Sequence, residues 1–129
     1  MNLTKLLIIH AIATLAAGIA LIVTPDLIPS AVDIHIDPSA YLVCYLLGTS
    51  ELAIAFLSYY SKELKDTKAL RLVSLTFIVF HASTAIVEVY AFTQGLSAAI
   101  WGNVALRVLV AILFTYYGLY KTPLIRTSI

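Results

Sequence analysis

The sequence predicts an all-α integral membrane protein, a four-helix bundle, and three observations support this fold class. Hydrophobic residues make up 61% of the chain and charged residues only 12%, whereas an ordinary soluble domain carries about 25% charged residues. Four apolar runs are each long enough to cross a bilayer as a helix, which takes about 20 residues. The Lys and Arg residues outside these runs gather in the connections of one side. We therefore expect a single domain, residues 1–129, with the bilayer as its solvent.

The first apolar run, Leu3–Val23, has a lysine near its start and continues into small and branched apolar residues. A secretory signal peptide begins in the same way, but its apolar region has only about 7–15 residues. This longer run is therefore predicted to be a retained span. The other runs cover Ala40–Tyr60, Leu70–Phe92 and Ala98–Tyr120. Because lipid offers the backbone no hydrogen bonds, each run is predicted to be a helix.

The charges of the connections indicate the orientation of the chain. The connection between the first and second spans carries Asp26, Asp33 and Asp37 but neither Lys nor Arg. All cations outside the span interiors fall on the opposite side, namely Lys5, Lys62, Lys65, Lys68, Arg71, Lys121 and Arg126. Since Lys and Arg gather on the cytoplasmic side of membrane proteins, we expect a protein of the cytoplasmic (inner) membrane with both termini in the cytoplasm.

Two pairs of short segments indicate an internal repeat. Ile9-His10-Ala11 of the first span resembles Phe80-His81-Ala82 of the third, and residues 56–60 of the second span resemble residues 113–117 of the fourth. This correspondence predicts two repeated α-hairpins related by an axis along the membrane normal. Tyrosine pairs and apolar runs are common in membrane helices, so chance explains the match as well as descent does.

The third span carries a thin polar stripe along one side. Its members, one or two helical turns apart, are Ser74, His81, Thr84 and Glu88. An ionisable group inside a span is costly, usually faces the interior of the bundle, and marks a functional site by default. The stripe therefore predicts a polar centre within the bundle.

Counting residues from the ends of each run gives a depth for every polar side chain of the spans. Near the midplane lie Glu51, His81 and Arg107, with Glu88 and Asn103 further out and His10 nearer the cytoplasm. These six residues form the candidate ligand-binding set. An unpaired arginine at the midplane costs about 2.5–3.5 kcal/mol. We therefore expect Arg107 to pair with a carboxylate, and Glu51 is the carboxylate nearest its level.

This set contains two carboxylates, Glu51 and Glu88, and one guanidinium, Arg107. With His81 neutral, the set therefore carries one negative charge. One proton shared among His81 and the two carboxylates would make it neutral, and the three groups would then titrate together.

The second span contains Leu47-Gly48-Thr49-Ser50-Glu51-Leu52. A Gly-x-x-Glu-Leu motif in the second of four short spans, followed by a basic cytoplasmic turn, resembles the DoxX-like bacterial membrane proteins. Gly48, Glu51 and Leu52 match the motif, and Arg107 of the fourth span matches more loosely. The resemblance implies an inner-membrane accessory protein, in some members tied to sulfur or thiol redox systems. With Cys44 as its single cysteine, this chain cannot carry out dithiol chemistry alone.

The polar centre favours a binding function. Four short helices around a few polar groups form a pocket for a lipophilic molecule such as a quinone, isoprenoid or lipid, or a docking site for a partner membrane subunit. The alternative is a membrane-embedded enzyme in which Glu51, His81 and Glu88 perform acid–base catalysis on a lipophilic substrate. A structural ion network that sets helix register, and an ion or proton pathway in a homo-oligomer, are further alternatives.

Two other site hypotheses have less support. His10 and His81 lie on different spans, as bis-imidazole haem ligation requires, but at different depths. Asp33, His35 and Asp37 alternate with apolar residues, so an extended segment would place three metal ligands on one face, or would lie apolar side down on the outer leaflet. We assign no metal and leave the cofactor open. The chain has no basic cluster interleaved with aromatic residues, so we expect no nucleic-acid partner.

Overall fold

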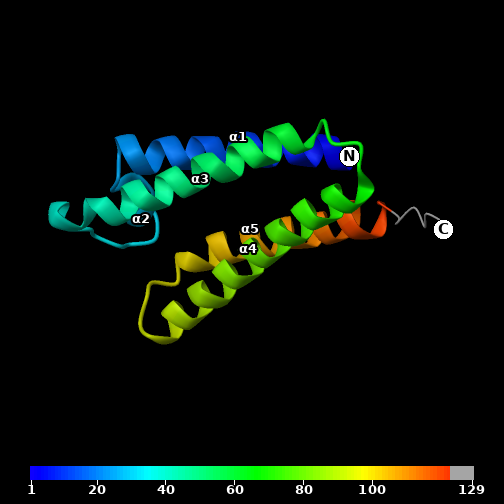
Figure 1. Ribbon diagram of the computed structural model, residues 1–129. Coiled ribbons are helices and arrows are strands. Elements are labelled where there is room, and N and C mark those ends of the chain that lie inside the picture. The colour runs from blue at the N-terminus through cyan, green and yellow to red at the C-terminus, as the bar shows by residue number, and fades with distance from the viewer. Residues whose placement is uncertain (123–129) are drawn as a thin grey trace.

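The computed structural model describes residues 1–122 and is built from helices and their connections (Figure 1). Four segments are long and apolar enough to cross a membrane, which confirms the predicted all-α membrane bundle. The spans are α1 (Leu3–Val23), α3 (Tyr41–Ser61), α4 (Thr67–Thr93) and α5 (Ile100–Phe114), the last continued by the π-helical η2 (Thr115–Tyr120). The short α2 (Leu27–Ser30) and the 3-10 turn η1 (Pro38–Ala40) lie between α1 and α3. Arg126, one of the predicted cytoplasmic cations, lies outside the described residues.

Side-chain caps and one glycine define the ends of the long helices. Asn2 accepts a hydrogen bond from the backbone N–H of Lys5 at the start of α1, and Asp66 accepts one from Lys68 at the start of α4. The Asp66 cap explains why α4 begins at Thr67, before the apolar run itself. After α4 the chain turns at Gly95, whose φ of 101° lies in the left-handed region that favours glycine.

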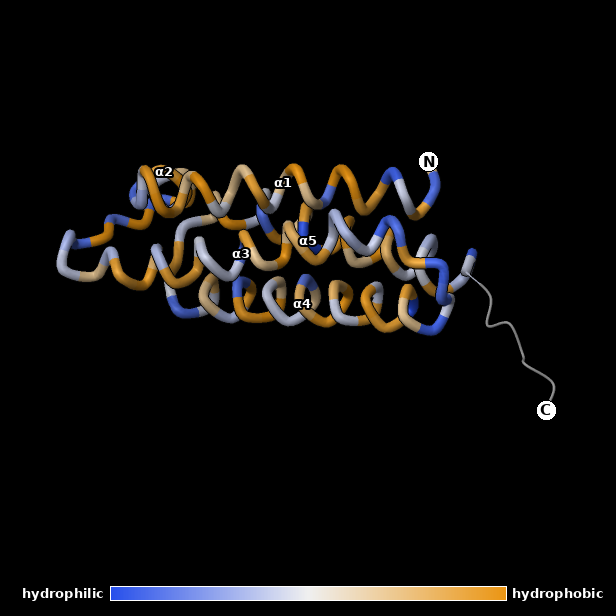
Figure 2. The backbone as a smooth tube through the Cα atoms, turned by 45° about the horizontal axis from the view of Figure 1, so that its top comes forward, coloured by the Kyte–Doolittle hydropathy of each residue, from blue (hydrophilic) through white to orange (hydrophobic). Residues whose placement is uncertain are grey.

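Hydrophobic residues occur along the length of every span (Figure 2). Large aliphatic side chains are exposed on every span, including Ile12, Leu42, Ile86 and Leu109. In water an exposed apolar surface of this extent would mark a docking site or lead to aggregation. In a bilayer it faces lipid tails, so the high hydropathy of the chain resides mainly on the outside of the protein.

The four spans form two hairpins, α1 with α3 and α4 with α5. The first hairpin is close-packed at two glycines that face each other. A Cβ atom on Gly18 would lie 2.9 Å from the carbonyl oxygen of Gly48, and a Cβ on Gly48 would lie 2.9 Å from that of Gly18. The absence of a side chain at both positions allows the two helices to approach this closely.

The two hairpins converge toward the end that carries the N-terminus and diverge toward the opposite end (Figure 1). At the converging end, the core consists of Leu6 and Leu7 of α1, Phe77 of α4 and Phe114 of α5. At the other end, Val32 from the connection after α2 packs against a small cluster of α4 and α5. The polar centre lies between these two apolar contacts.

Candidate functional site

His10 of α1 and His81 of α4 meet directly between the hairpins. Their Nε2 atoms are 2.9 Å apart, and both side chains are buried. The ring of His10 also packs against Phe77 and Phe114, with centroids 4.6 and 5.1 Å away. The predicted difference in depth between the two histidines is therefore wrong. Because α4 is longer than α1 and inclined to it (Figure 1), counting residues from the start of each helix did not measure depth.

The partners of the histidine pair determine where its hydrogens lie. The Ser58 hydroxyl lies 2.9 Å from the carbonyl oxygen of Leu7 and 3.0 Å from Nδ1 of His10. A carbonyl can only accept, so Ser58 donates to Leu7 and accepts from His10 Nδ1–H. On the other side, Nη1 of Arg107 lies 3.4 Å from Nδ1 of His81. A guanidinium can only donate, so His81 accepts at Nδ1 and carries its hydrogen on Nε2.

These assignments make one directed chain of hydrogen bonds. Arg107 donates to His81, His81 to His10, His10 to Ser58, and Ser58 to the carbonyl of Leu7. Each imidazole carries one hydrogen, so both histidines are neutral. A second hydrogen on His10 would place two N–H groups opposite each other and break the contact. We call Leu7, His10, Ser58 and His81 the histidine half of the centre.

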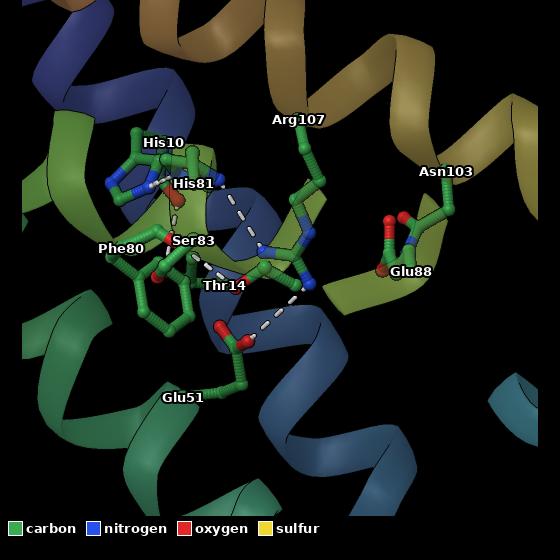
Figure 3. Close-up of polar contacts among 10 residues, drawn as sticks. His10, Thr14, Glu51, Phe80, His81, Ser83, Glu88, Asn103 and Arg107 are labelled. Atoms are coloured by element: carbon green, nitrogen blue, oxygen red, sulfur yellow. Dashed lines mark hydrogen bonds and ion pairs between the residues drawn. The ribbon is translucent and has the colours of Figure 1, made fainter. Parts of the chain in front are cut away.

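The other half of the centre is much less satisfied (Figure 3). Nη2 of Arg107 lies 3.9 Å from Oε1 of Glu51, so the predicted pair is present but longer than a hydrogen bond. Within residues 1–122, Nε of Arg107 is buried without a hydrogen-bond partner. Its guanidinium also lies 5.5 Å from the centroid of the Phe80 ring. The guanidinium thus makes only long polar contacts.

Glu88 of α4 and Asn103 of α5 complete this second half. The Asn103 amide donates to Oε1 of Glu88, whereas Oε2 of Glu88 is buried and has no partner among the described residues. Together with Glu51 and Arg107 they form what we call the carboxylate half. The structure therefore brings all six predicted residues into one region. Their hydrogen bonds divide them into the well-bonded histidine half and the poorly bonded carboxylate half.

Ser58 is the centre residue that the site prediction missed. It lies two helical turns from Glu51 on the buried face of α3, which is the signal that could have identified it. Ser74 and Thr84 of the predicted polar stripe instead bond to carbonyls of their own helix, those of Leu70 and Phe80.

The histidine contact does not have the geometry of haem ligation. Metal–imidazole bonds are about 2.0 Å long, so an iron between two trans imidazoles would separate their nitrogens by about 4 Å. The Nε2 atoms of His10 and His81 are 2.9 Å apart and share a hydrogen bond. In this arrangement no iron fits between them.

The outer connection does not gather its three candidate metal ligands. Asp33 adopts a φ of 59° and accepts a hydrogen bond from Ser97. Hydrogen bonds from the hydroxyl and backbone N–H of Ser39 hold the pKa of the Asp37 carboxyl below its ordinary value. In the part of the chain that the structure describes, no three His, Cys, Asp or Glu side chains are grouped to hold a metal ion.

Comparison with known proteins adds no relative. No family model matches the chain, and neither the curated proteins nor the solved structures contain a match. The functional argument therefore depends on the geometry of the polar centre.

Proposed function

We propose that the protein binds a lipophilic small molecule with a polar head, such as a quinone, isoprenoid or lipid, at the carboxylate half of its polar centre. The observation that carries this proposal is the poor hydrogen bonding of Arg107. Its contacts to His81 and Glu51 are 3.4 and 3.9 Å long, and its Nε has no partner within residues 1–122. Lipid tails cannot supply the missing partners, so a polar head bound there would stabilise the guanidinium.

The surroundings suit the lipophilic part of such a molecule. An apolar groove of about 460 Å³ lies between α4 and α5, which is within the size range of ligand pockets. Its walls include Ala85, Val89, Val104 and Val108. The first two are near neighbours of Glu88 along α4, and the last two flank Arg107 on α5. The groove thus follows the two helices that carry Glu88 and Arg107, and neither of these side chains is among its lining residues.

Extraction of small molecules from the purified protein tests this proposal. The protein is purified in mild detergent, and bound molecules are identified by mass spectrometry. We expect a lipophilic compound that is enriched with the native protein and lost from Arg107→Gln. The lipid-facing Leu106→Ala, whose side chain is exposed, is the control. Equal amounts from all three proteins would contradict the proposal. Loss of a co-purifying membrane protein instead would identify the occupant as a partner subunit.

An enzyme is the second candidate function, and Glu51 favours it. This side chain is buried, and its nearest polar contact is the ion pair of 3.9 Å with Arg107. A carboxylate so weakly engaged is suited to act as a general base, with Glu88 as a second carboxylate. His81 could take part in proton transfer only after Arg107 stops donating a hydrogen bond to its Nδ1. Conversion of the co-purifying compound by the native protein but not by Glu51→Gln would support the enzyme.

The membrane and the orientation belong to the same proposal. The described cations of the connections and termini lie at the end of the bundle that carries the N-terminus (Figure 1), namely Lys5, Lys62, Lys65, Lys68, Arg71 and Lys121. The positive-inside rule then supports an inner-membrane protein with cytoplasmic termini. The resemblance of Gly48, Glu51 and Leu52 to the DoxX-like motif supports an accessory role in that membrane.

A further inference from the structure

The buried charges of the polar centre do not balance. Glu51 and Glu88 each contribute a negative charge, and Arg107 contributes the single positive charge. His10 and His81 contribute none, because the hydrogen-bond chain from Arg107 to Leu7 leaves each imidazole with one hydrogen. One negative charge therefore remains without a counter-charge among the side chains of the centre.

Glu88 forms no ion pair in the described part of the chain, and the cation near it, Arg107, is shared with Glu51. The ion pair of Arg107 is with Glu51, whereas Glu88 accepts one hydrogen bond from the neutral Asn103 amide. Its Oε2 is buried without a partner in the described part of the chain. Titratable groups on the elements around α4 do not supply the missing cation. They are Arg107 on α5, Glu51 on α3, the neutral His10 on α1, and Asp33 in the outer connection, which is bonded to Ser97.

An uncompensated carboxylate in a membrane either takes up a proton or pairs with a cation. We propose that Glu88 is the docking point for the positively charged head of a lipophilic organic cation, such as a protonated amine, which exchanges there with a proton. This inference rests on the proposed function and narrows its ligand class to a lipophilic cation whose charged group lies at Glu88 and whose neutral oxygen atoms, such as a hydroxyl or carbonyl, accept from Arg107. The apolar groove between α4 and α5 is lined by Ala85 and Val89, which are near Glu88 along α4, and it favours a lipophilic body over a hydrated metal ion.

Other head groups fit the centre less well. A carboxylate or phosphate head would add a negative charge where one is already in excess. The carbonyl oxygens of a quinone could accept from Arg107 Nε, but they have no hydrogen to donate to Glu88 Oε2. Any lipophilic cation cancels the excess charge, and an ammonium head in addition donates to Glu88 Oε2, so the charge count defines the class and the donor pattern favours amines within it.

A pair of ions with the same shape and opposite charge gives the sharpest test. Binding of tetraphenylphosphonium and tetraphenylborate to the purified full-length protein is measured by equilibrium dialysis in a neutral detergent. We expect the phosphonium to bind and the borate not to bind. The cation displaces one proton from Glu88. In the pH range where free Glu88 is protonated, the apparent affinity for the cation should therefore fall about tenfold for each unit by which the pH is lowered. One proton should be released per cation in weakly buffered solution.

Three variants assign the binding to Glu88. Glu88→Gln retains the size and loses the charge, so it should lose both cation binding and its pH dependence. Glu88→Asp keeps the charge on a shorter side chain and should retain the pH dependence at lower affinity, which also covers the case in which Glu88→Gln does not fold. Glu63→Gln removes an exposed carboxylate at the cytoplasmic end and should leave binding unchanged. Thermal unfolding establishes that each variant is folded.

The outcomes separate this inference from the proposed function. A neutral photoreactive alkanol reports whether any lipophilic molecule enters the centre. Cross-links near Arg107, without phosphonium binding or protection by it, would overturn the cation inference and leave the proposed function standing. Borate binding as tight as phosphonium binding would also overturn the cation inference. Absence of both cross-linking and ion binding would overturn both.

Discussion

His10 and His81, which occupy matching positions in the two predicted repeats, bond to each other through their Nε2 atoms at 2.9 Å. Equivalent residues meet in this way when they lie next to the axis that relates two repeats. The contact joins α1 to α4 and thereby the first hairpin to the second. It also marks the boundary between the apolar core at the end that carries the N-terminus and the carboxylate half.

The grooves of the two hairpins follow the same correspondence. The groove between α1 and α3, of about 350 Å³, and the groove between α4 and α5 share three equivalent wall positions. In the numbering of the repeats these are Ala11 and Ala82, Leu15 and Ile86, and Ala55 and Ile112. The polar residues do not follow it, because Glu88, Asn103 and Arg107 all belong to the second hairpin. This asymmetry supports a specialised second hairpin.

The hydrogen-bond chain predicts a different tautomer for each histidine of the pair. His10 should carry its hydrogen on Nδ1 and His81 on Nε2, because Ser58 accepts from the first and Arg107 donates to the second. Nitrogen NMR of the ¹⁵N-histidine-labelled protein distinguishes the two forms, and His35→Gln removes the third histidine signal. Two rings with the same tautomer would contradict the assigned chain.

Ser58→Ala should destabilise the protein by about 1–3 kcal/mol. The substitution leaves the buried N–H of His10 without its partner, whereas the Leu7 carbonyl keeps its helical hydrogen bond within α1, and an unsatisfied buried donor costs about that much. Ser61→Ala is the matched control, because the Ser61 hydroxyl is also buried but bonds only to the Leu57 carbonyl of its own helix. Denaturant unfolding in detergent should give a smaller change for Ser61→Ala. Equal changes would mean that the Ser58–His10 bond contributes nothing.

The helix spans could be predicted from sequence because a long apolar run is visible in the order of residues alone, without knowledge of how the helices pack. A run of about 20 apolar residues has no other stable conformation in lipid. The one notable extension, the start of α4 at Thr67, depends on the side chain of Asp66. Caps of this kind lie in polar connections, where a hydropathy pattern has no signal.

The interior of the centre could be predicted only in part. Depth counting identified the Glu51–Arg107 pair, since both residues lie far from the ends of their helices. It missed the contact between His10 and His81, because that contact depends on the inclination and rotation of α4 against α1. It also missed Ser58, since the hydroxyl of a serine in a span usually bonds to its own helix, as that of Ser61 does.

Gly18→Ala should destabilise the first hairpin by about 1–3 kcal/mol, the usual effect of overpacking. Its Cβ would lie 2.9 Å from the Gly48 carbonyl oxygen, a backbone atom that cannot move aside cheaply. Gly102→Ala in α5 is the control, because nothing lies within 4 Å of its new Cβ. There alanine should be neutral or stabilising by up to about 1 kcal/mol, since glycine is a poor helix former. Thermal unfolding of both variants measures the difference. A smaller loss at Gly18 than at Gly102 would contradict the observed packing.

Single cysteines test the orientation, in a Cys44→Ala background. Lys65→Cys, in the exposed connection between α3 and α4, should be shielded from an impermeant thiol reagent in intact cells. His35→Cys, in the exposed connection before η1, should react. Both sites should react after the membrane is permeabilised, which controls for folding. Labelling of Lys65→Cys in intact cells would reverse the proposed topology.

The pairing of Arg107 with Glu51 predicts coupled effects of substitution. Arg107→Leu strands a carboxylate, which can take up a proton and become neutral. Glu51→Gln strands the arginine, which cannot lose its charge in the same way. We therefore expect Glu51→Gln to destabilise the protein more than Arg107→Leu. The double variant should recover part of the loss, by about 0.5–3 kcal/mol of coupling.

The same double-mutant cycle, built from Glu51→Gln, Arg107→Leu and the double variant, distinguishes a structural ion pair from a binding site. If the pair only holds the helices together, the double variant should recover part of the lost stability and retain the co-purifying molecule. If the pair holds the ligand, the stability should return without the binding. Effects that simply add would mean that Arg107 and Glu51 do not interact across their 3.9 Å separation. Glu88 would then be the carboxylate that compensates the arginine, and the same cycle with Glu88→Gln should show the missing coupling.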